Sequence, residues 1–190
     1  MALQENALIS VEEVFNYLRL ATPETTDPQY QLIEALINRA SDECERFING
    51  PIINKTVTED LDGTGTDTKV LTYRPIQSIT SVLVDGIDWS ANVGFYPHGV
   101  IFTKNGASFP EKRQIINVTY VAGYGETKDT IPQGIKQAAL LIVQFWFKRD
   151  SLDYSQTFGE SDIITGETAG VNRFPYTALR MLDSYRKVVI

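Results

Sequence analysis

The sequence predicts an α+β fold: a bundle of about four helices with an antiparallel β-subdomain inserted between the second and the third helix. Two observations lead to this prediction. Apolar residues recur at helical spacing in residues 11–48 and again from Pro132 onward. Between these regions the period changes to the alternation of half-buried strands, with turn residues between the alternating stretches. The expected boundaries are residues 1–50, 51–128 and 129–190.

Capping residues predict where the first two helices begin. Ser10 and Glu13 have the spacing of a capping box, and we expect a helix from there to about Leu20. Asp27 followed by proline predicts the second beginning, because aspartate caps free N–H groups and proline fits the first helical turn. Residues 49–51, Asn-Gly-Pro, are expected to end this helix.

Short alternating stretches predict the strands of the inserted segment. They are residues 56–61, 70–73, 79–84, 99–102 and 114–121. Asp85-Gly86 indicates a hairpin turn. Trp89, Phe95 and Tyr96 fall in the longer connection that follows, and we expect them to cover one face of the sheet.

The third helix begins at Pro132 and is apolar almost all round. Such a helix is buried on more than one side. We therefore expect this helix either to lie at the centre of the fold or to be buried in part against neighbouring subunits. We take Phe145, Trp146 and Phe147 as the candidate subunit contacts.

The C-terminal part changes the sign of its charge. Residues 150–170 hold five acidic side chains and no basic one, so we expect an acidic loop. A last helix begins at Phe174-Pro175, with Leu179, Leu182 and Tyr185 on one stripe. Residues 171–190 carry four basic side chains against one acidic, a net charge of +3. The plain interpretation is a loop before an amphipathic helix; the sharper one is a basic tail that docks on an acidic partner.

Composition excludes several classes of protein. The net charge of −7 disfavours sequence-reading nucleic-acid binding, which needs basic groups to neutralise phosphates. The single cysteine excludes a disulfide within the chain and a multi-cysteine metal site. The first ten residues lack a signal peptide's pattern, and the longest apolar run, residues 138–143, is too short for a membrane span. We therefore expect a cytosolic origin.

Residues typical of catalysis do not form a site in the sequence. His98 has no evident nucleophile or orienting partner, and Cys44 lies on the apolar side of its helix. Asp60 and Asp62 flank a glycine-rich turn, but the spacing of a calcium loop fails. We expect no catalytic residue, no metal and no cofactor. A small hydrolase or carbohydrate-binding module that uses Trp89, Tyr96 and scattered carboxylates is a remote alternative.

Seven segments occur in an order that is quite specific as a set. They are LISVEEVFNYLRL, QLIEALINRASDECERFING, LDGTG, YRPIQSITSVLVDG, VTYVAGYG, IPQGIKQAALLIVQFWFKRD and LRMLDSYRKV. Together they resemble the head–tail connector proteins (adaptor, or head-completion, proteins) of tailed double-stranded DNA bacteriophages. The resemblance extends over nearly the whole chain and implies a helical bundle with a β-insertion.

The resemblance implies a structural role in the virion. Members form a ring, usually a dodecamer, beneath the portal after genome packaging, extend the DNA channel, and offer a platform for the next connector, stopper or tail protein. The expected location is the head–tail junction, after synthesis in the host cytoplasm. DNA passes without sequence-specific binding, and no membrane is involved. A tail-completion or other neck component is the alternative.

The family's C-terminal segment typically contacts the portal. Carried over to this chain, the contact would involve the last helix and its flanks: Arg173, Leu179, Arg180, Leu182, Tyr185, Arg186 and Lys187. Arginine and tyrosine are enriched among the residues that dominate interface energetics, which suits such a contact.

Overall fold

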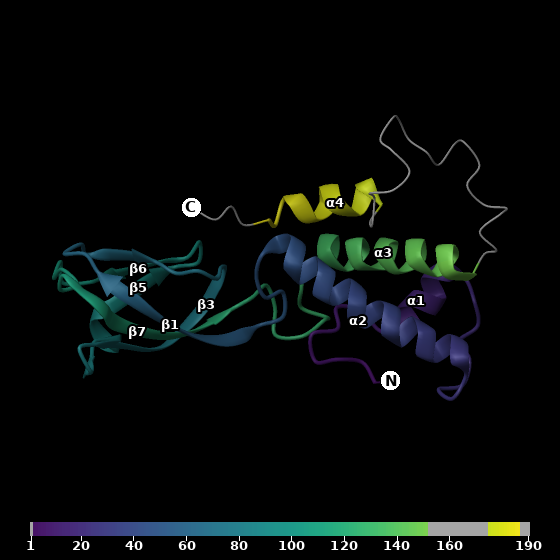
Figure 1. Cartoon of the computed structure of the whole chain (residues 1–190), viewed down its shortest axis with the longest axis horizontal. Coiled ribbons are helices and arrows are strands. Elements are labelled where there is room, and N and C mark those ends of the chain that lie inside the picture. Colours follow the sequence, from purple (N-terminus) through teal and green to yellow (C-terminus); the bar gives the residue numbers. More distant parts are fainter. Residues whose placement is uncertain (1, 152–174, 187–190) are drawn as a thin grey trace. The chain divides into compact units, whose positions relative to one another are not determined.

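The computed structural model describes residues 2–151 and 175–186 (Figure 1). In these residues the chain forms four α-helices and antiparallel strands, and all the strands lie between the second and third helices. The predicted α+β class with an inserted β-segment is therefore confirmed. Arg173, Lys187 and residues 152–170 of the expected acidic loop lie outside the described residues.

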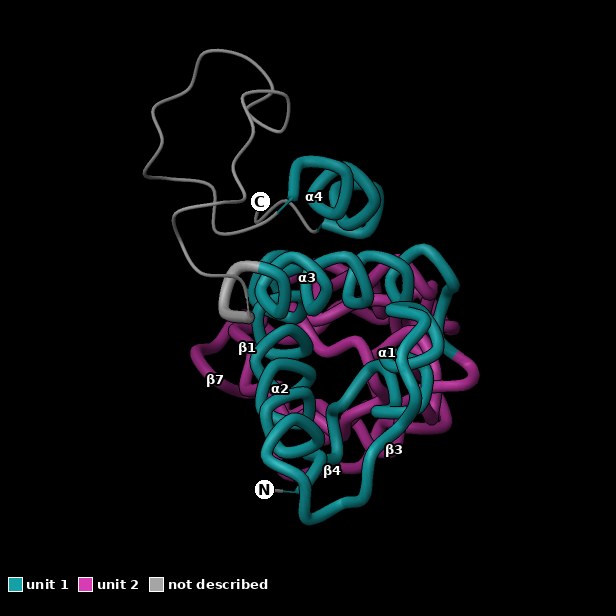
Figure 2. Tube along the Cα trace, turned by 90° about the vertical axis from the view of Figure 1, so that its right-hand side faces the viewer, with its two compact units in different colours: residues 1–49, 131–190 teal, residues 50–130 magenta. Residues whose placement is uncertain are grey.

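The chain divides into two compact units, which Figure 2 shows in different colours. The helical unit contains residues 1–49 and 131–190, and the β-unit contains residues 50–130. Because a domain is a unit that can fold alone, the expected domain boundaries stay a prediction that independent expression of the β-unit would test.

The first two helices begin at the predicted caps. α1 spans Val11–Leu18 and α2 spans Pro28–Ile48. The Ser10 side chain accepts a hydrogen bond from the Glu13 N–H at 3.2 Å, and the Glu13 carboxylate accepts one from the Ser10 N–H at 2.7 Å. This is a complete capping box, so two donors that the helix leaves free are satisfied.

The end of α1 differs slightly from the expected one. The helix ends at Leu18, not near Leu20, because Arg19 takes the left-handed conformation with φ 58°. Its N–H bonds back to the carbonyl of Asn16 at 3.1 Å. A C-cap of this kind is usually a glycine, so the sequence carried no clear signal for it.

α3, which spans Gln133–Ser151, is the central helix of the helical unit. It contacts α1, α2 and α4, and α4 spans Tyr176–Asp183. Its buried apolar residues are Ile135, Ala138, Ala139, Ile142, Val143, Trp146 and Phe147. Three helices of the same chain thus cover the broad apolar surface that the sequence showed.

A partly buried ion pair joins the first helix to α3. Lys136 is 8% exposed, and its Nζ donates to the Glu13 carboxylate at 2.8 Å. The same carboxylate closes the capping box of α1. A lysine on the covered side of α3 is tolerated because its charge is paired there.

The β-unit contains two antiparallel sheets. The first has the strand order β1 (Lys55–Gly63), β7 (Lys112–Ala122), β3 (Ile76–Val84) and β4 (Ile87–Asp88). The second has the order β2 (Thr68–Val70), β6 (Val100–Thr103) and β5 (Val93–Tyr96), and a short 3₁₀ helix, η1, spans Ser90–Asn92.

The two sheets share one core. β7 alternates as predicted, since Ile116, Val118, Tyr120 and Ala122 are buried and the residues between them are not. Its buried residues belong to the same cluster as Val93 of β5 and Ile101 of β6, in the other sheet. The β-unit therefore has its own hydrophobic core.

The sequence did not predict β4 or β5. Phe95 and Tyr96 were expected in a connection and lie instead in β5, which pairs with β6. β5 has four residues and includes Gly94, a residue that weakens strand propensity. The glycine is required there, because a Cβ at this position would lie 2.5 Å from the Phe102 ring on β6. Only the packed partner strand reveals that reason.

Candidate functional site

His98 and Cys44, the single histidine and the single cysteine of the sequence, have structural surroundings. His98 is exposed in the turn after β5, and its ring stacks on Tyr96 with centroids 5.3 Å apart. Cys44 is fully buried on α2, and burial raises the pKa of its thiol to about 12. At neutral pH the thiolate is therefore scarce, which disfavours a nucleophilic role.

The carboxylates of the glycine-rich turn have structural partners. Asp60 accepts a hydrogen bond from the Asn117 amide at 2.7 Å, and Asp62 accepts one from the backbone N–H of Gln114 at 2.7 Å. Within residues 2–151 and 175–186, no three His, Cys, Asp or Glu side chains are placed to hold a metal ion together.

The two aromatic residues of the carbohydrate-binding alternative lie in different environments. Trp89 packs against the core of the β-unit and stacks on Phe109 with ring centroids 5.9 Å apart. Tyr96 is 50% exposed and lies between His98 and Phe102, 4.8 Å from the latter ring. The two rings therefore do not form one shared surface that a sugar ring could stack on.

A partly buried polar cluster around Tyr120 joins β7 to β1 and to the chain before β3. The Tyr120 hydroxyl donates to Glu59 of β1 and accepts a hydrogen bond from the Tyr73 N–H at 3.1 Å. Glu59 also accepts the Thr72 N–H at 3.1 Å. Burial raises the pKa of Tyr120, and the bond to Glu59 raises it further. The cluster satisfies backbone groups of a loop, which is a structural use.

Two residues of the predicted partner site are exposed on α4 and just past its end. Arg180 and Arg186 are exposed, and the Arg180 guanidinium lies 5.8 Å from the centroid of the Tyr176 ring. Tyr176 is itself 68% exposed. An arginine held over an exposed tyrosine is a pair of the type that anchors protein interfaces.

The opposite side of α4 packs on the rest of the helical unit. Leu182 is 1% exposed, and Leu179 and Tyr185 are partly covered. Of the predicted partner residues, Leu182 is therefore occupied within its own chain. α4 thus has one packed face and one free face.

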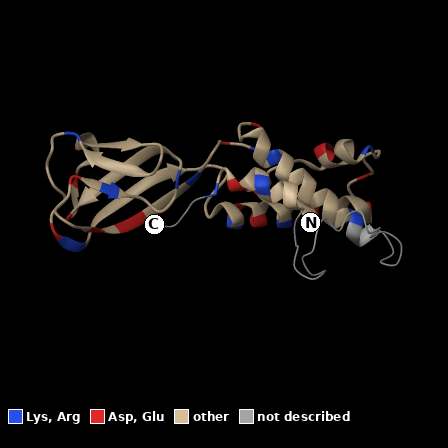
Figure 3. Ribbon diagram, turned by 90° about the horizontal axis from the view of Figure 1, so that it is seen from above, with Lys and Arg blue, Asp and Glu red and all other residues tan. Residues whose placement is uncertain are grey.

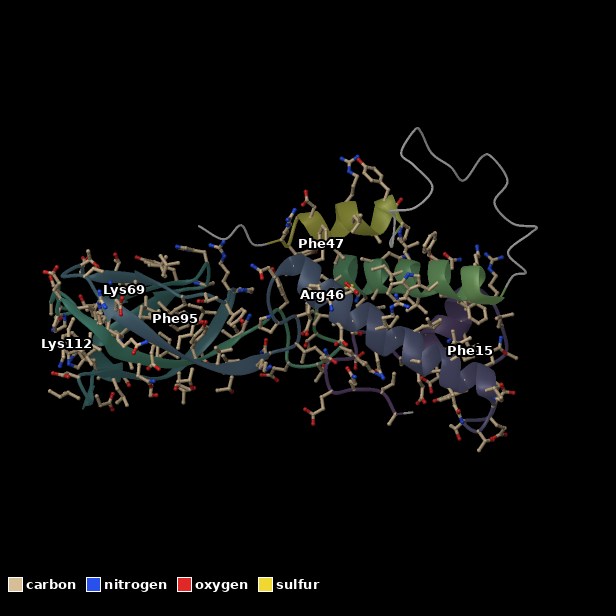
Figure 4. All side chains as sticks on the ribbon, in the orientation of Figure 1. Phe15, Arg46, Phe47, Lys69, Phe95 and Lys112 are labelled. Atoms are coloured by element: carbon tan, nitrogen blue, oxygen red, sulfur yellow. The ribbon has the colours of Figure 1, made fainter. Side chains whose placement is uncertain are left out.

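Two residues outside the predicted set hold α4 in place. The Arg186 guanidinium lies 5.4 Å from the ring centroid of Phe47 on α2, which Figure 4 labels. Gly134 lies against Tyr185, since a Cβ on the glycine would lie 3.0 Å from the tyrosine Oη. We call Phe47 and Gly134, with the adjoining surfaces of α2 and α3, the α4 seat. A glycine in the first turn of an otherwise apolar helix was the sequence signal for it.

The three candidate subunit contacts on α3 have different exposures. Trp146 is 1% exposed and Phe147 is 8% exposed, whereas Phe145 is partly exposed. The Arg39 guanidinium lies 4.5 Å from the centroid of the Trp146 ring. A subunit contact by α3 would therefore involve Phe145 first.

A bilayer span is not found among the helices of the described residues, since none combines enough length with enough apolar character.

Charged residues are interspersed over the helices (Figure 3). Residues 175–186, which include α4, carry two basic side chains, Arg180 and Arg186, and one acidic side chain, Asp183. The excess positive charge expected for the C-terminal segment thus depends partly on Arg173 and Lys187, outside the described residues.

Comparison with known proteins gives a family and a set of similar folds. The family model described as head completion protein matches residues 7–188. No curated protein matches the chain. Among solved structures, a chain of the neck of the empty gene transfer agent (GTA) particle, computed with C6 symmetry, has a TM-score of 0.66 and 17% identity. The alignment covers 100% of this chain and 97% of that one.

Two further structures are similar over the same extent. One is the virion of the native gene transfer agent particle, and the other is the neck of the native particle computed with C12 symmetry. Each has a TM-score of 0.64, 17% identity and coverage of 100% of this chain and 94% of the other. At this identity the likeness shows a shared fold that includes both units.

Proposed function

The chain belongs to the head completion protein family, and from this premise we propose that it is a structural, non-enzymatic protein of a bacteriophage neck, where copies form a ring beneath the portal. The observation that carries the proposal is the extent of the family match, residues 7–188, which includes the helical unit, the β-unit and α4. The family expected from the ordered sequence motifs is thereby confirmed.

The similar structures support a ring. They come from neck and virion assemblies, two of which were computed with C6 and C12 symmetry. In a closed ring of this order, each copy contacts its neighbours through two different surfaces. We propose a dodecamer, with Phe145 on α3 as one contributor to the contact between copies.

We propose that the ring extends the DNA channel and serves as the attachment platform for the next connector or tail protein. The net charge of −7 supports passage of DNA without adhesion, because like charges repel. The free face of α4, with Arg180 and Tyr176, is the proposed contact with the portal. The proposed location is the head–tail junction of the virion.

Assembly in the presence of portal tests this function. Native mass spectrometry and multi-angle light scattering of the chain, alone and mixed with purified portal, should show a discrete oligomer with portal bound. A free monomer alone is compatible with the proposal, because the portal can act as the template for the ring. A chain that stays monomeric and separate from portal under all conditions contradicts it. Imaging of particles then distinguishes a ring beneath the portal from a component further down the neck.

Charge reversal on α4 should weaken attachment to the portal. In the variant Arg180→Glu, which leaves the contact of Arg186 with Phe47 in place, we expect at least about 30-fold weaker binding, since an anchoring residue at an interface contributes about 2 kcal/mol or more. Surface plasmon resonance on immobilised portal measures the effect. The variant Lys148→Glu, which reverses one exposed charge elsewhere, is the matched control. Equal binding of the two variants to portal would contradict the proposed contact between α4 and the portal.

A further inference from the structure

The α4 helix is joined to the rest of its chain by an unusually long connection. Residues 152–175, which are 24 residues, separate the end of α3 from the start of α4. Connections between packed helices usually contain about 2–8 residues. The connection is therefore longer than holding α4 against its own α3 requires.

α4 packs antiparallel to α3, an arrangement that a short connection could join. Tyr185, just past the end of α4, lies against Gly134 in the first turn of α3, so the two helices run side by side in opposite directions (Figure 1). The start of α4 therefore faces the second half of α3. A connection of a few residues would join the end of α3 to the start of α4, whereas 24 residues in extended form reach about 80 Å.

The seat of α4 is specific but small. Within α4, the fully buried side chains are Ala178 and Leu182, and the helix has no side-chain cap at its N-terminus. Specificity comes from the close approach of Tyr185 to Gly134 and from the stacking of Arg186 on Phe47. Every copy of the chain carries the same seat and the same helix.

We propose that, when copies assemble into the ring, α4 leaves the seat in its own chain and occupies the identical seat of a neighbouring copy. This inference rests on the proposed function, because it needs a ring. The exchange loses no contact, since Gly134 and Phe47 of the neighbour offer α4 the same surface. Copies held side by side present their seats at high effective concentration, so the second binding event needs no new interface. Dissociation of the ring would then require each exchanged helix to unpack.

The exchange leaves the free face of α4 unchanged. Tyr176 and Arg180 point away from the packed face in either arrangement, so the helix can contact the portal while it links two copies. The two faces of one short helix would thus serve two contacts of the assembly.

Thiol cross-linking between two single variants tests the exchange. Chains with Gly134→Cys are mixed with chains with Tyr185→Cys, assembled on portal and treated with a short bis-maleimide reagent. The added thiols meet only across the seat, and removal of the tyrosine ring makes room for the new side chain at position 134. Cys44 is buried and stays unreactive. We expect most cross-linked product to be a covalent dimer of one variant with the other.

The double variant Gly134→Cys/Tyr185→Cys supplies the matched comparison. As a dilute free monomer it should cross-link within the chain, and in the assembled ring it should give a ladder of linked copies. A ring whose product stays monomeric in size, or in which neither sample cross-links, overturns the exchange while the ring itself stands. A wild-type chain that never assembles overturns the proposed function instead.

Deletion of residues 155–170 gives a second measurement. It leaves 8 residues between Ser151 and Tyr176, a usual length for a connection between packed helices, and cuts the extended reach of the connection to about a third. We expect a folded chain whose assembly on portal is weakened at least tenfold. Assembly equal to that of the full chain contradicts the exchange.

Discussion

Replacing Trp146 with alanine should lower the free energy of unfolding by about 3–5 kcal/mol, the range for truncating a large buried aromatic side chain. Trp146 is 1% exposed on the central helix, and its ring also carries the Arg39 guanidinium at 4.5 Å. Truncation leaves a cavity between helices that cannot close fully. Chemical denaturation followed by circular dichroism measures the loss.

The neighbouring Phe145 provides the matched control. Because this ring is partly exposed, Phe145→Ala should destabilise the chain less than Trp146→Ala does. If Phe145 contacts a neighbouring subunit, its truncation should weaken ring assembly while the monomer stays folded. Wild-type stability in Trp146→Ala, combined with a defect in assembly, would show that Trp146 belongs to an interface between subunits.

Replacing Tyr120 with phenylalanine should lower the free energy of unfolding by about 1–3 kcal/mol, the effect of leaving a buried polar group without its partner. The hydroxyl of Tyr120, a fully buried residue, donates to Glu59 and accepts the Tyr73 N–H at 3.1 Å. Removing it leaves that N–H without its partner. Tyr73→Phe is the control, because it keeps the backbone N–H and the cluster. Equal stability of the two variants contradicts a stabilising role.

The same pair predicts a dependence on alkaline pH. Burial holds the pKa of Tyr120 above the value of about 10 that a tyrosine has in an unfolded chain. A group whose pKa is raised by folding stabilises the protein fully below the unfolded pKa and loses that contribution as pH rises beyond it. The stability difference between the wild type and Tyr120→Phe should therefore be constant up to about pH 10 and shrink above it. Denaturation curves from pH 8 to pH 11 measure it.

Local signals in the sequence predicted most elements of the fold. Ser10 with Glu13 and Asp27 before a proline marked two helix starts, since caps act over three or four residues. The alternation in residues 116–121 marked β7, an inner strand of the larger sheet. Local signals missed β4, which has two residues, and β5, whose pairing with β6 involves two short strands and a glycine.

The candidate site was predicted in part. Arg180 is exposed on α4 and Arg186 is exposed just past its end, and the contact with the portal stays a prediction. Leu182, named with them, packs inside its own chain. Phe47 and Gly134 were not named, because their importance comes from contacts with residues 51 or more positions away in the chain.

The sequence by itself determined the class of fold, the order of the elements and the family, because periodicity, caps and ordered motifs are properties of neighbouring residues. Tertiary structure alone decided which apolar side chains are covered. The sequence showed that α3 is apolar nearly all round, and the structure assigned that surface to α1, α2 and α4 of the same chain. The physical reason is that the burial of a side chain depends on what packs against it. The residues that pack together are far apart in the sequence, and no local pattern shows which of them will meet.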